Sequence, residues 1–336
     1  MYRMLFIAHL YKDTRRNYIM RLLILLLAIV IGSARGRECK WNTQADYSVA
    51  NNVLTFNSNC TSIGKVSDEC DGFPSNVTEV VLPQGLTYVS TRAFRRCDKL
   101  TSVTFPETLD SVGTSAFAYC TGLTSVTFPG LQQVGASAFF ACSSLTNVTL
   151  PEGLKQVGAT AFRGCSSLTS VTFPETLNSV GEYAFAYCDK LTSVTFPKVR
   201  EISRYAFYKS GVISVFARAG FVAEGDSYIG EYAFAYCPVH DVTLRGPFGE
   251  SEGFIIYNHA FEPSELRRLH IQGPVQLQGP RSLSHTYGHR GRISLLNGPC
   301  YEGNYHSDAC KNKIAEEYSQ TQFIDLYNRN YTSTCN

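Results

Sequence analysis

The chain has 336 residues, of which 17% are charged and 44% are hydrophobic, and its formal net charge is +2. This near balance of charge leaves no basic field for a polyanion, so we expect no nucleic-acid partner. Because 21 Phe and 20 Tyr supply ample apolar surface to bury, a disordered protein is excluded as well.

The N-terminal segment has the pattern of a signal peptide. Residues 22–32 read LLILLLAIVIG after several basic residues, and the small residues at 32–34 suit signal peptidase. A run this short does not span a bilayer, which takes about 20 apolar residues. We predict a signal peptide over residues 1–34, starting at Met1 or Met20, and a secreted or extracellular-surface protein without a membrane span after its removal. The alternatives are an uncleaved anchor and a buried helix of an intracellular protein.

Four N-x-[ST] sequons are compatible with a secretory route. Each marks an acceptor for an N-linked glycan on the surface of a secreted protein. The predicted glycosylation sites are Asn59, Asn76, Asn147 and Asn330.

A 23-residue repeat dominates the middle of the chain. Residues 100–122 and 168–190 agree at 18 of 23 positions, and such self-similarity is the signature of a solenoid. We predict about eight to nine copies over residues 77–271, an N-terminal cap at 35–76 and a C-terminal cap at 272–336. The copies begin at Val77, Leu100, Leu123, Leu145, Leu168, Leu191, Val212, Val239 and Leu266.

Each unit predicts one short strand and one short helical turn. In Leu-x-x-Val-x-Phe, apolar residues alternate with Ser or Thr as in a half-buried strand, and the proline that follows ends ladder pairing because it lacks an N–H. Apolar residues then recur every four positions, as at Val180, Ala184 and Cys188, which predicts α-helix or 3₁₀-helix. One unit cannot bury its apolar side alone, so stacked copies predict an α/β repeat solenoid with one parallel strand per unit.

The unit LTSVTFPxxLxxVGxxAFxxC resembles the BspA-like class of leucine-rich repeat over roughly residues 77–271. The preceding NNVLTF at residues 51–56 resembles the strand that caps many such proteins. The resemblance implies a curved horseshoe that serves extracellular binding or adhesion. It brings no catalytic motif and no cofactor.

The twelve cysteines fall into two groups. Three lie on each side of the repeats, and we predict the disulfides Cys39–Cys60 and Cys300–Cys310, so that one cysteine per end is unpaired or reaches into the repeats. The other six share one repeat column, where parallel Cβ vectors favour buried thiols over a disulfide ladder. No CxxC pair or recurring histidine pair points to a metal. The column residues are Cys97, Cys120, Cys142, Cys165, Cys188 and Cys237.

No motif in the sequence indicates catalysis. His285 and His289 form the one close histidine pair, but Gly288 and the lack of a neighbouring glutamate make a zinc site improbable, and a surface loop is favoured. The sequence contains no nucleophile elbow, phosphate-binding loop or calcium loop. We therefore predict no enzymatic activity, no metal and no cofactor.

The exposed strand positions carry small polar side chains and form the predicted binding surface. On the inner curve of a horseshoe they would offer uncharged hydroxyls to an extracellular protein or glycan, although Thr is also simply a good strand former. A glycan on Asn147 would obstruct this surface and move binding to the convex side or to the insertions at 217–228 and 245–254. The predicted residues are Ser102, Thr104, Ser125, Thr127, Asn147, Thr149, Ser170, Thr172, Ser193 and Thr195.

These patterns together predict a secreted or cell-surface binding or adhesion module. One alternative is a structural coat glycoprotein that associates with copies of itself. Another is an intracellular interaction scaffold, if the N-terminal segment does not act as a signal. No oligomeric state follows from the sequence.

Overall fold

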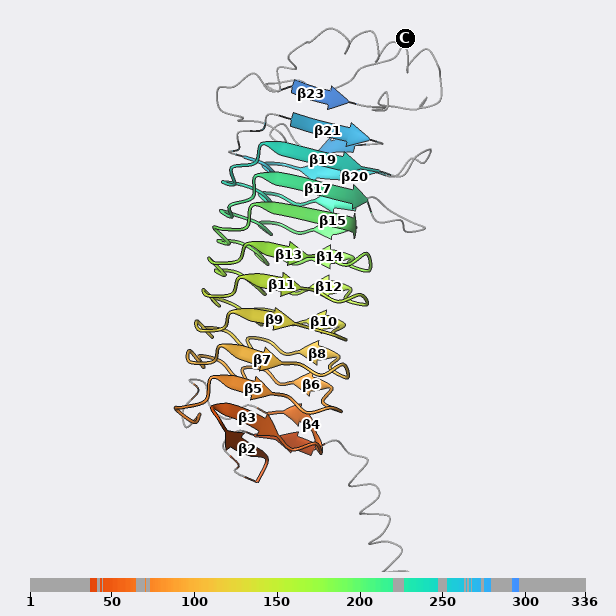
Figure 1. Ribbon diagram of the computed structural model, residues 1–336. Coiled ribbons are helices and arrows are strands. Elements are labelled where there is room, and N and C mark those ends of the chain that lie inside the picture. The colour runs from red at the N-terminus through yellow and green to blue at the C-terminus, as the bar shows by residue number, and fades with distance from the viewer. Residues whose placement is uncertain are drawn as a thin grey trace, which may run out of the picture.

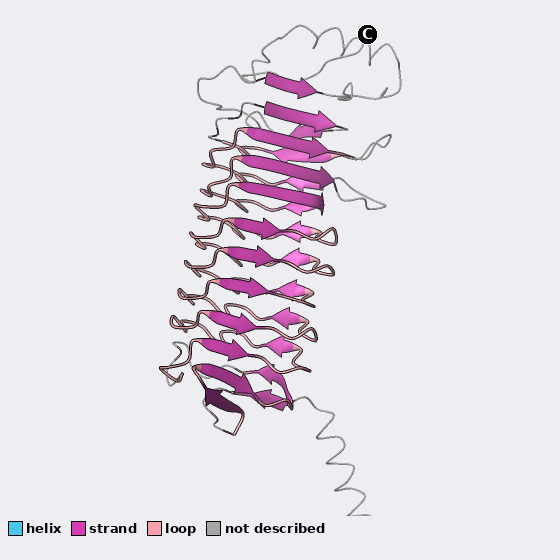
Figure 2. Ribbon diagram, viewed as in Figure 1, coloured by secondary structure: helices cyan, strands magenta, loops and turns pink. Residues whose placement is uncertain are grey.

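The structure is a computed structural model, and Figure 1 shows it as a long stack of short parallel strands. The predicted signal peptide lies outside the described part. No helix occurs among the described residues, which form strands and turns (Figure 2), and none is therefore long and apolar enough to cross a membrane. The described residues are 37–40, 43, 45–64, 70, 73–219, 227–246, 253–262, 264, 266, 268–272, 275–278 and 292–295.

The strands form three sheets in which successive turns of the chain, or rungs, supply neighbouring strands. The eleven-stranded sheet runs in the order β1 (Arg37–Cys39), β4 (Cys60–Ile63), β6 (Tyr88–Val89), β8 (Ser111–Val112), β10 (Gln133–Val134), β12 (Gln156–Val157), β14 (Ser179–Val180), β16 (Glu201–Ile202), β18 (Ser227–Ile229), β20 (Phe254–Tyr257) and β22 (Val275–Gln278). The seven-stranded sheet runs in the order β13 (Ser170–Thr172), β11 (Asn147–Thr149), β9 (Ser125–Thr127), β7 (Ser102–Thr104), β5 (Glu79–Val81), β3 (Val53–Phe56) and β2 (Tyr47–Ala50). The five-stranded sheet runs in the order β15 (Ser193–Val199), β17 (Ser214–Ala219), β19 (Asp241–Arg245), β21 (Arg268–Gln272) and β23 (Arg292–Leu295).

Each regular unit contributes two short strands, where the repeat pattern predicted one. The two strands lie in different sheets, and each is parallel to the equivalent strands of the adjacent units. The first strand is the expected Ser-Val-Thr segment, with Val148 of β11 paired in register to Val126 and Val171. The second is a two-residue strand such as β12, which pairs with β10 and β14. A strand this short is too brief to show a two-residue hydrophobic period, which explains why the sequence pattern did not reveal it.

The predicted helical turn is wrong, because a run of tight turns occupies that segment. The Ala116 amide donates within its own rung, three residues back, whereas the Phe117 amide donates to the Ala138 carbonyl of the next rung at 2.8 Å. Ser115 and Tyr119 have φ angles of 55° and 63°, which are incompatible with a right-handed helix. Alternate amides therefore bond within the rung and between rungs, and we call residues such as 114–119 the turn segment of a rung.

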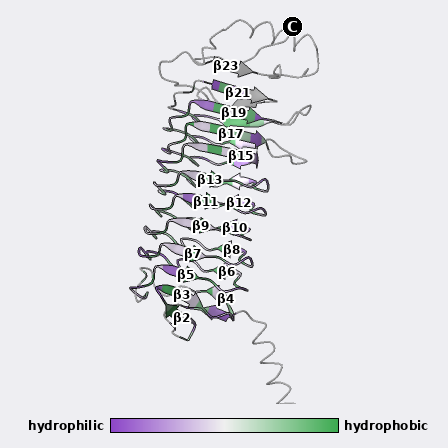
Figure 3. Ribbon diagram, in the orientation of Figure 1, coloured by the Kyte–Doolittle hydropathy of each residue, from purple (hydrophilic) through white to green (hydrophobic). Residues whose placement is uncertain are grey.

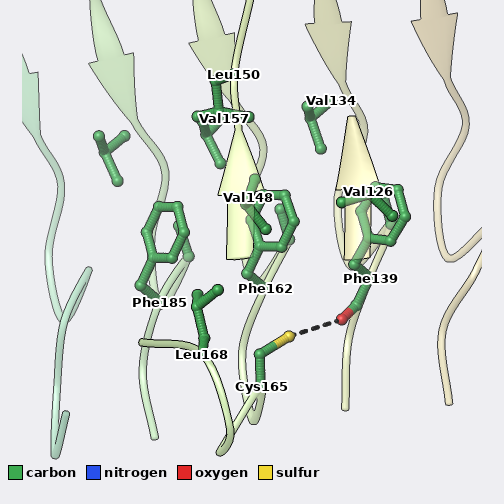
Figure 4. Packing of buried hydrophobic residues seen from close by; sticks show 14 of the residues in the cluster. Val126, Val134, Phe139, Val148, Leu150, Val157, Phe162, Cys165, Leu168 and Phe185 are labelled. Carbon is green, nitrogen blue, oxygen red and sulfur yellow. Dashed lines mark hydrogen bonds between the residues drawn. The ribbon is translucent and has the colours of Figure 1, made fainter. Parts of the chain in front are cut away.

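Phenylalanine rings stack along the axis of the solenoid and form the centre of its core. The ring of Phe162 lies between those of Phe139 and Phe185, with centroids 5.3 and 5.2 Å apart and planes within 8° (Figure 4). This spacing is close to that of neighbouring strands, so the rung repeat itself brings the rings into contact. The stacked residues, all buried, are Phe94, Phe117, Phe139, Phe162, Phe185, Phe207, Phe234 and Phe261.

A β-hairpin begins the stack at its N-terminal end. Strands β2 and β3 pair in antiparallel fashion, whereas every other paired strand is parallel among the described residues. The hairpin turns at Asn51 and Asn52, whose φ angles of 51° and 66° suit the type I′ turn that matches strand twist. The segment predicted to be a capping strand therefore forms β3 and pairs with β5 of the first repeat.

Two disulfides fasten this end. Cys39 and Cys60 are bonded as predicted, with Cα atoms 5.6 Å apart on neighbouring strands. The third cysteine of the N-terminal flank, Cys70, reaches into the repeats, as one of the two predicted alternatives had it, and is bonded to Cys97. The prediction that Cys97 is a buried free thiol is therefore wrong. The predicted Cys300–Cys310 pair lies outside the described residues.

The other five cysteines of the column are buried free thiols, as the sequence predicted. Cys165 Sγ donates to the Phe139 carbonyl oxygen at 3.3 Å, and the same contact recurs along the column (Figure 4). Burial raises the pKa of the Cys165 and Cys237 thiols, each to about 12. These thiols therefore stay neutral in the folded protein and fill space as small hydrophobic groups.

Strand pairing continues beyond residue 271, where the repeat signature ends. Strand β22 pairs with β20, and β23 pairs with β21. The described part of the predicted C-terminal cap thus adds one strand to the eleven-stranded sheet and one to the five-stranded sheet. The rest of that segment lies outside the described residues.

Replacing Phe162 by alanine tests the role of the stacked rings. We expect the free energy of unfolding to fall by about 3–5 kcal/mol, because the substitution leaves a cavity and each of the two neighbouring rings loses one of its two stacking partners. Urea unfolding followed by circular dichroism measures the loss. The exposed substitution Thr172→Ala on the next rung should change stability by less than about 0.5 kcal/mol. Equal effects of the two substitutions would contradict the packing model.

The buried thiols predict a loss of stability at alkaline pH. A thiol whose pKa is raised on folding stabilises the protein fully below its unfolded pKa of about 8.5, and this contribution disappears as pH rises toward the folded pKa. We expect Cys165→Ser to reduce the slope between about pH 8.5 and 11 by up to about 1.4 kcal/mol per pH unit. The comparison is urea unfolding of both proteins across this range. Parallel stability curves would show that Cys165 does not remain protonated in the folded state.

Candidate binding surface

The predicted polar residues lie together on the outer faces of β7, β9, β11, β13 and β15. Ser125, Asn147 and Ser170 are in register, and so are Thr127, Thr149 and Thr172. The buried valine between the two rows, Val148 on β11, forces its neighbours outward because successive strand residues point to opposite faces. The structure therefore brings the predicted residues into two parallel rows, which we call the hydroxyl ladder.

The two rows differ in how much of their hydrogen-bonding capacity is in use. In the first row, Ser170 Oγ donates to Asn147 Oδ1 at 2.7 Å, and Asn147 Nδ2 donates to Thr146 Oγ1 at 3.2 Å. In the second row, the exposed hydroxyls of Thr127 and Thr149 form no side-chain hydrogen bond to any described residue. The threonine row is therefore the part of the ladder that is open to a ligand.

A third column of threonines has a structural role that the sequence reasoning did not separate from the ladder. The Thr124 hydroxyl donates to the carbonyl of Thr101 in the preceding rung at 3.1 Å, and Thr146 does the same to Thr124. These hydroxyls form hydrogen bonds between neighbouring rungs at the N-terminal ends of the strands. Their donors are consumed within the protein and are not available for recognition.

The same face changes character toward the C-terminal rungs. The green segments of β17 and β19 in Figure 3 include the buried Val215 and Val242, so the outer face is read from the other positions. Those positions carry Phe216, Arg218, Asp241 and Arg245. Arg245 lies over the ring of Phe216 at 5.1 Å, and Arg268 pairs with Asp241 through two hydrogen bonds. Large parts of the predicted insertions, residues 220–226 and 247–252, lie outside the described residues. The uncharged surface is thus confined to the serine, threonine and asparagine positions of β7, β9, β11, β13 and β15, since Glu79 on β5 is in register with Ser102.

The predicted glycosylation sites occupy exposed positions wherever they are described. Asn59 lies in the turn between β3 and β4, and Asn76 precedes the first repeat strand. Asn147 lies in the middle of the hydroxyl ladder, on β11. Asn330 lies outside the described residues. A glycan on Asn147 would therefore cover the central strands of the ladder.

The turn segments of three successive rungs carry a tyrosine cluster that the sequence reasoning missed. Tyr183, Tyr205 and Tyr232 stack face to face, with centroids 4.6 and 5.0 Å apart, and His259 extends the stack at 4.7 Å. The motif EYAFAYC, repeated at residues 182–188 and 231–237, was the available signal. We call this set the tyrosine surface; it comprises Tyr183, Tyr187, Tyr205, Tyr208, Tyr232 and Tyr236.

Two tyrosines at the centre of the tyrosine surface have a raised pKa. Partial burial, together with the neighbouring Tyr205, raises the pKa of Tyr183 and of Tyr232. Tyr208 meets the rings of Tyr187 and Tyr236 edge to face at 5.8 and 5.4 Å. The result is a fixed array of rings with phenol donors at its rim.

The described residues contain no group of three or more His, Cys, Asp or Glu side chains placed to hold a metal ion. The histidine pair at His285 and His289 lies outside them. What the described surface offers is contact area and hydrogen-bonding groups on a rigid frame.

Comparison with known proteins places this architecture in a family. The model of the BspA type leucine rich repeat region matches six copies over residues 66–171 and 117–240, which together span more than half of the chain. No curated protein matches the chain.

Several solved structures resemble the protein at low sequence identity. A leucine-rich repeat protein from Bacteroides ovatus is 19% identical, with 69% of this chain and 74% of that chain covered and a TM-score of 0.47. A leucine rich cell surface protein from Faecalibacterium prausnitzii is 20% identical, with 76% of each chain covered and a TM-score of 0.39. The T. pallidum leucine rich repeat protein is 22% identical, with 57% of this chain and 85% of that chain covered and a TM-score of 0.36.

No function follows from likenesses at this level. The family match, which rests on the repeats themselves, is sufficient for membership. This protein belongs to the BspA type leucine-rich repeat family.

Proposed function

We propose that the protein is a secreted or cell-surface module that binds an extracellular protein or glycan through its repeat surface. The observation that carries this proposal is the hydroxyl ladder, an exposed and uncharged double row that crosses five neighbouring strands. Solenoids of this kind commonly bind partners through such extended surfaces.

The chemistry of the ladder favours a partner with many neutral polar groups. The Thr127 and Thr149 hydroxyls are each able to donate one hydrogen bond and accept two. Because they stand on strands held by a packed core, they lose little conformational freedom on binding. A polypeptide backbone or a sugar chain laid across the strands meets a hydroxyl at every rung, about 4.8 Å apart.

Charges placed on the ladder should weaken binding. We expect Thr127→Lys combined with Thr172→Lys to reduce binding of residues 35–336 to cells or to a glycan array by about tenfold or more, because each lysine adds bulk and a desolvation cost to an uncharged contact. The matched control is Gln133→Lys with Gln156→Lys, which adds the same charge to exposed positions of the eleven-stranded sheet.

Equal binding by the two double variants would remove the ladder from the contact. Absence of any binding by the unmodified protein, combined with self-association at rising concentration, would favour the structural coat instead.

Glycosylation tests the secretory route and the ladder together. We expect the protein made through a secretory pathway to carry a glycan on Asn147, and Thr149→Val to remove it and to strengthen ligand binding, because the glycan covers the central strands. Peptide mass spectrometry and the same binding assay give the two readouts. Thr172→Val changes an equivalent hydroxyl and leaves the sequon intact. An unmodified Asn147 together with a retained residue 1–34 segment would support the intracellular scaffold.

A further inference from the structure

The tyrosine surface is held on a backbone conformation that tyrosine rarely adopts. Tyr183, Tyr187 and Tyr205 have φ angles of 54°, 59° and 58°, and Tyr232 and Tyr236 have 56° and 59°. Glycine and asparagine adopt this left-handed region at lower cost, and Gly164 occupies it in the neighbouring rung. The same turn positions are left-handed in other rungs, where Ser137, Ala141 and Thr160 occupy them, so the turn segments impose this conformation and the rings are built onto it.

Two cations on the tyrosine surface have no acidic partner among the described residues. The Arg163 guanidinium lies over the rings of Tyr183 and Tyr187, at 5.4 and 5.2 Å. The Lys209 ammonium lies 5.4 and 5.5 Å from the ring centroids of Tyr208 and Tyr236. The neighbouring Arg204, by contrast, is 3.6 Å from Glu231. Arg163 and Lys209 are thus held in place by aromatic rings while their charge remains available to an anion.

The backbones that carry the two cations are two rungs apart along the stack. The turn segments of Arg163 and Lys209 are therefore separated along the axis by about 10 Å, at the spacing of neighbouring strands. In a polyproline II segment, residues three apart share one face and lie about 9.3 Å apart. Such a segment has no internal hydrogen bonds, so its carbonyls are free to accept from phenol hydroxyls.

We propose that the tyrosine surface binds an acidic polypeptide segment in the polyproline II conformation, with carboxylates three residues apart on Arg163 and Lys209. The inference rests on the proposed role as a binding module and assigns a second contact surface, on the turn segments. Tyrosine and arginine are the residues that dominate protein–protein contacts, and rings fixed by stacking lose little freedom when a partner binds. Tyr236, which is 54% exposed, lies at one end of the surface.

The test uses a synthetic peptide that repeats Glu-Pro-Pro as the probe, with a Gln-Pro-Pro peptide and hyaluronate as comparisons. We expect the full chain to bind the acidic peptide and Arg163→Glu with Lys209→Glu to weaken binding by tenfold or more. Tyr236→Asn should weaken it several-fold, since asparagine suits the left-handed backbone and removes only the ring. Biolayer interferometry gives the affinities, and thermal unfolding confirms that each variant is folded.

The matched control is Lys155→Glu with Lys198→Glu, which makes the same change of net charge outside the turn segments. An equal loss in this control, equal binding of the neutral peptide, preference for hyaluronate, or no binding by the unmodified chain would each overturn the inference. Failure of these peptide measurements, with cell or glycan binding by the unmodified chain still present, would leave the proposed function standing and overturn this inference alone. Absence of cell and glycan binding by the unmodified chain would instead refute the proposed function.

Discussion

Hydrogen bonding between successive rungs is the constraint on which the structure depends. The strands of the regular units are two or three residues long, and their turn segments satisfy only alternate amides internally. The Phe162 amide donates to Ala184 of the next rung, and the Gly164 amide donates to Ala186. A rung is therefore stable only against another rung, and stability accumulates along the stack as a sum of neighbour contacts. The same spacing places identical side chains about 5 Å apart, which is why phenylalanines stack and threonines align.

Close approach of the rungs also explains the recurring glycine after the second strand. A Cβ on Gly158 would lie 2.7 Å from the Val134 carbonyl oxygen, and one on Gly135 would lie 2.6 Å from that of Val112. Contact with the preceding rung, and not a left-handed backbone, is what favours glycine here. The reverse holds in the turn segments, where the left-handed conformation is required and tyrosine nevertheless occupies it. Each rung thus limits its side chains in two ways. Close contact limits the size of the residue after the second strand, and a left-handed backbone limits the residue type in the turn segment.

The sequence was sufficient to predict the stack and the buried face of the first strand, because alternation and periodicity depend on local geometry alone. The Cys39–Cys60 pair was predicted from the position of its cysteines in the flank before the repeats. It misled at Val180, Ala184 and Cys188, whose four-residue spacing reflects a run of turns and not a helix. The conformation of the turns was hidden because few of the left-handed positions carry the glycine or asparagine that would announce them. The sequence allowed a flanking cysteine to reach into the repeats but did not identify Cys70 and Cys97 as the partners, because only the folded chain brings Cys70 beside the first rung.

The repeated hydroxyl ladder and the irregular tyrosine surface contribute differently to binding. The first supplies contact area, and the second can fix the position of a ligand along the stack. The hydroxyl ladder was predictable because every unit repeats it, but for that reason a ligand shifted by one rung meets nearly the same groups. Such a surface contributes area without fixing register. Residues that break the repeat, such as Arg163, Gly164 and Lys209, were missed because they differ between copies. These residues make the rungs different from one another. One position along the stack therefore has its own set of charges and rings. Specificity requires such a difference between neighbouring positions.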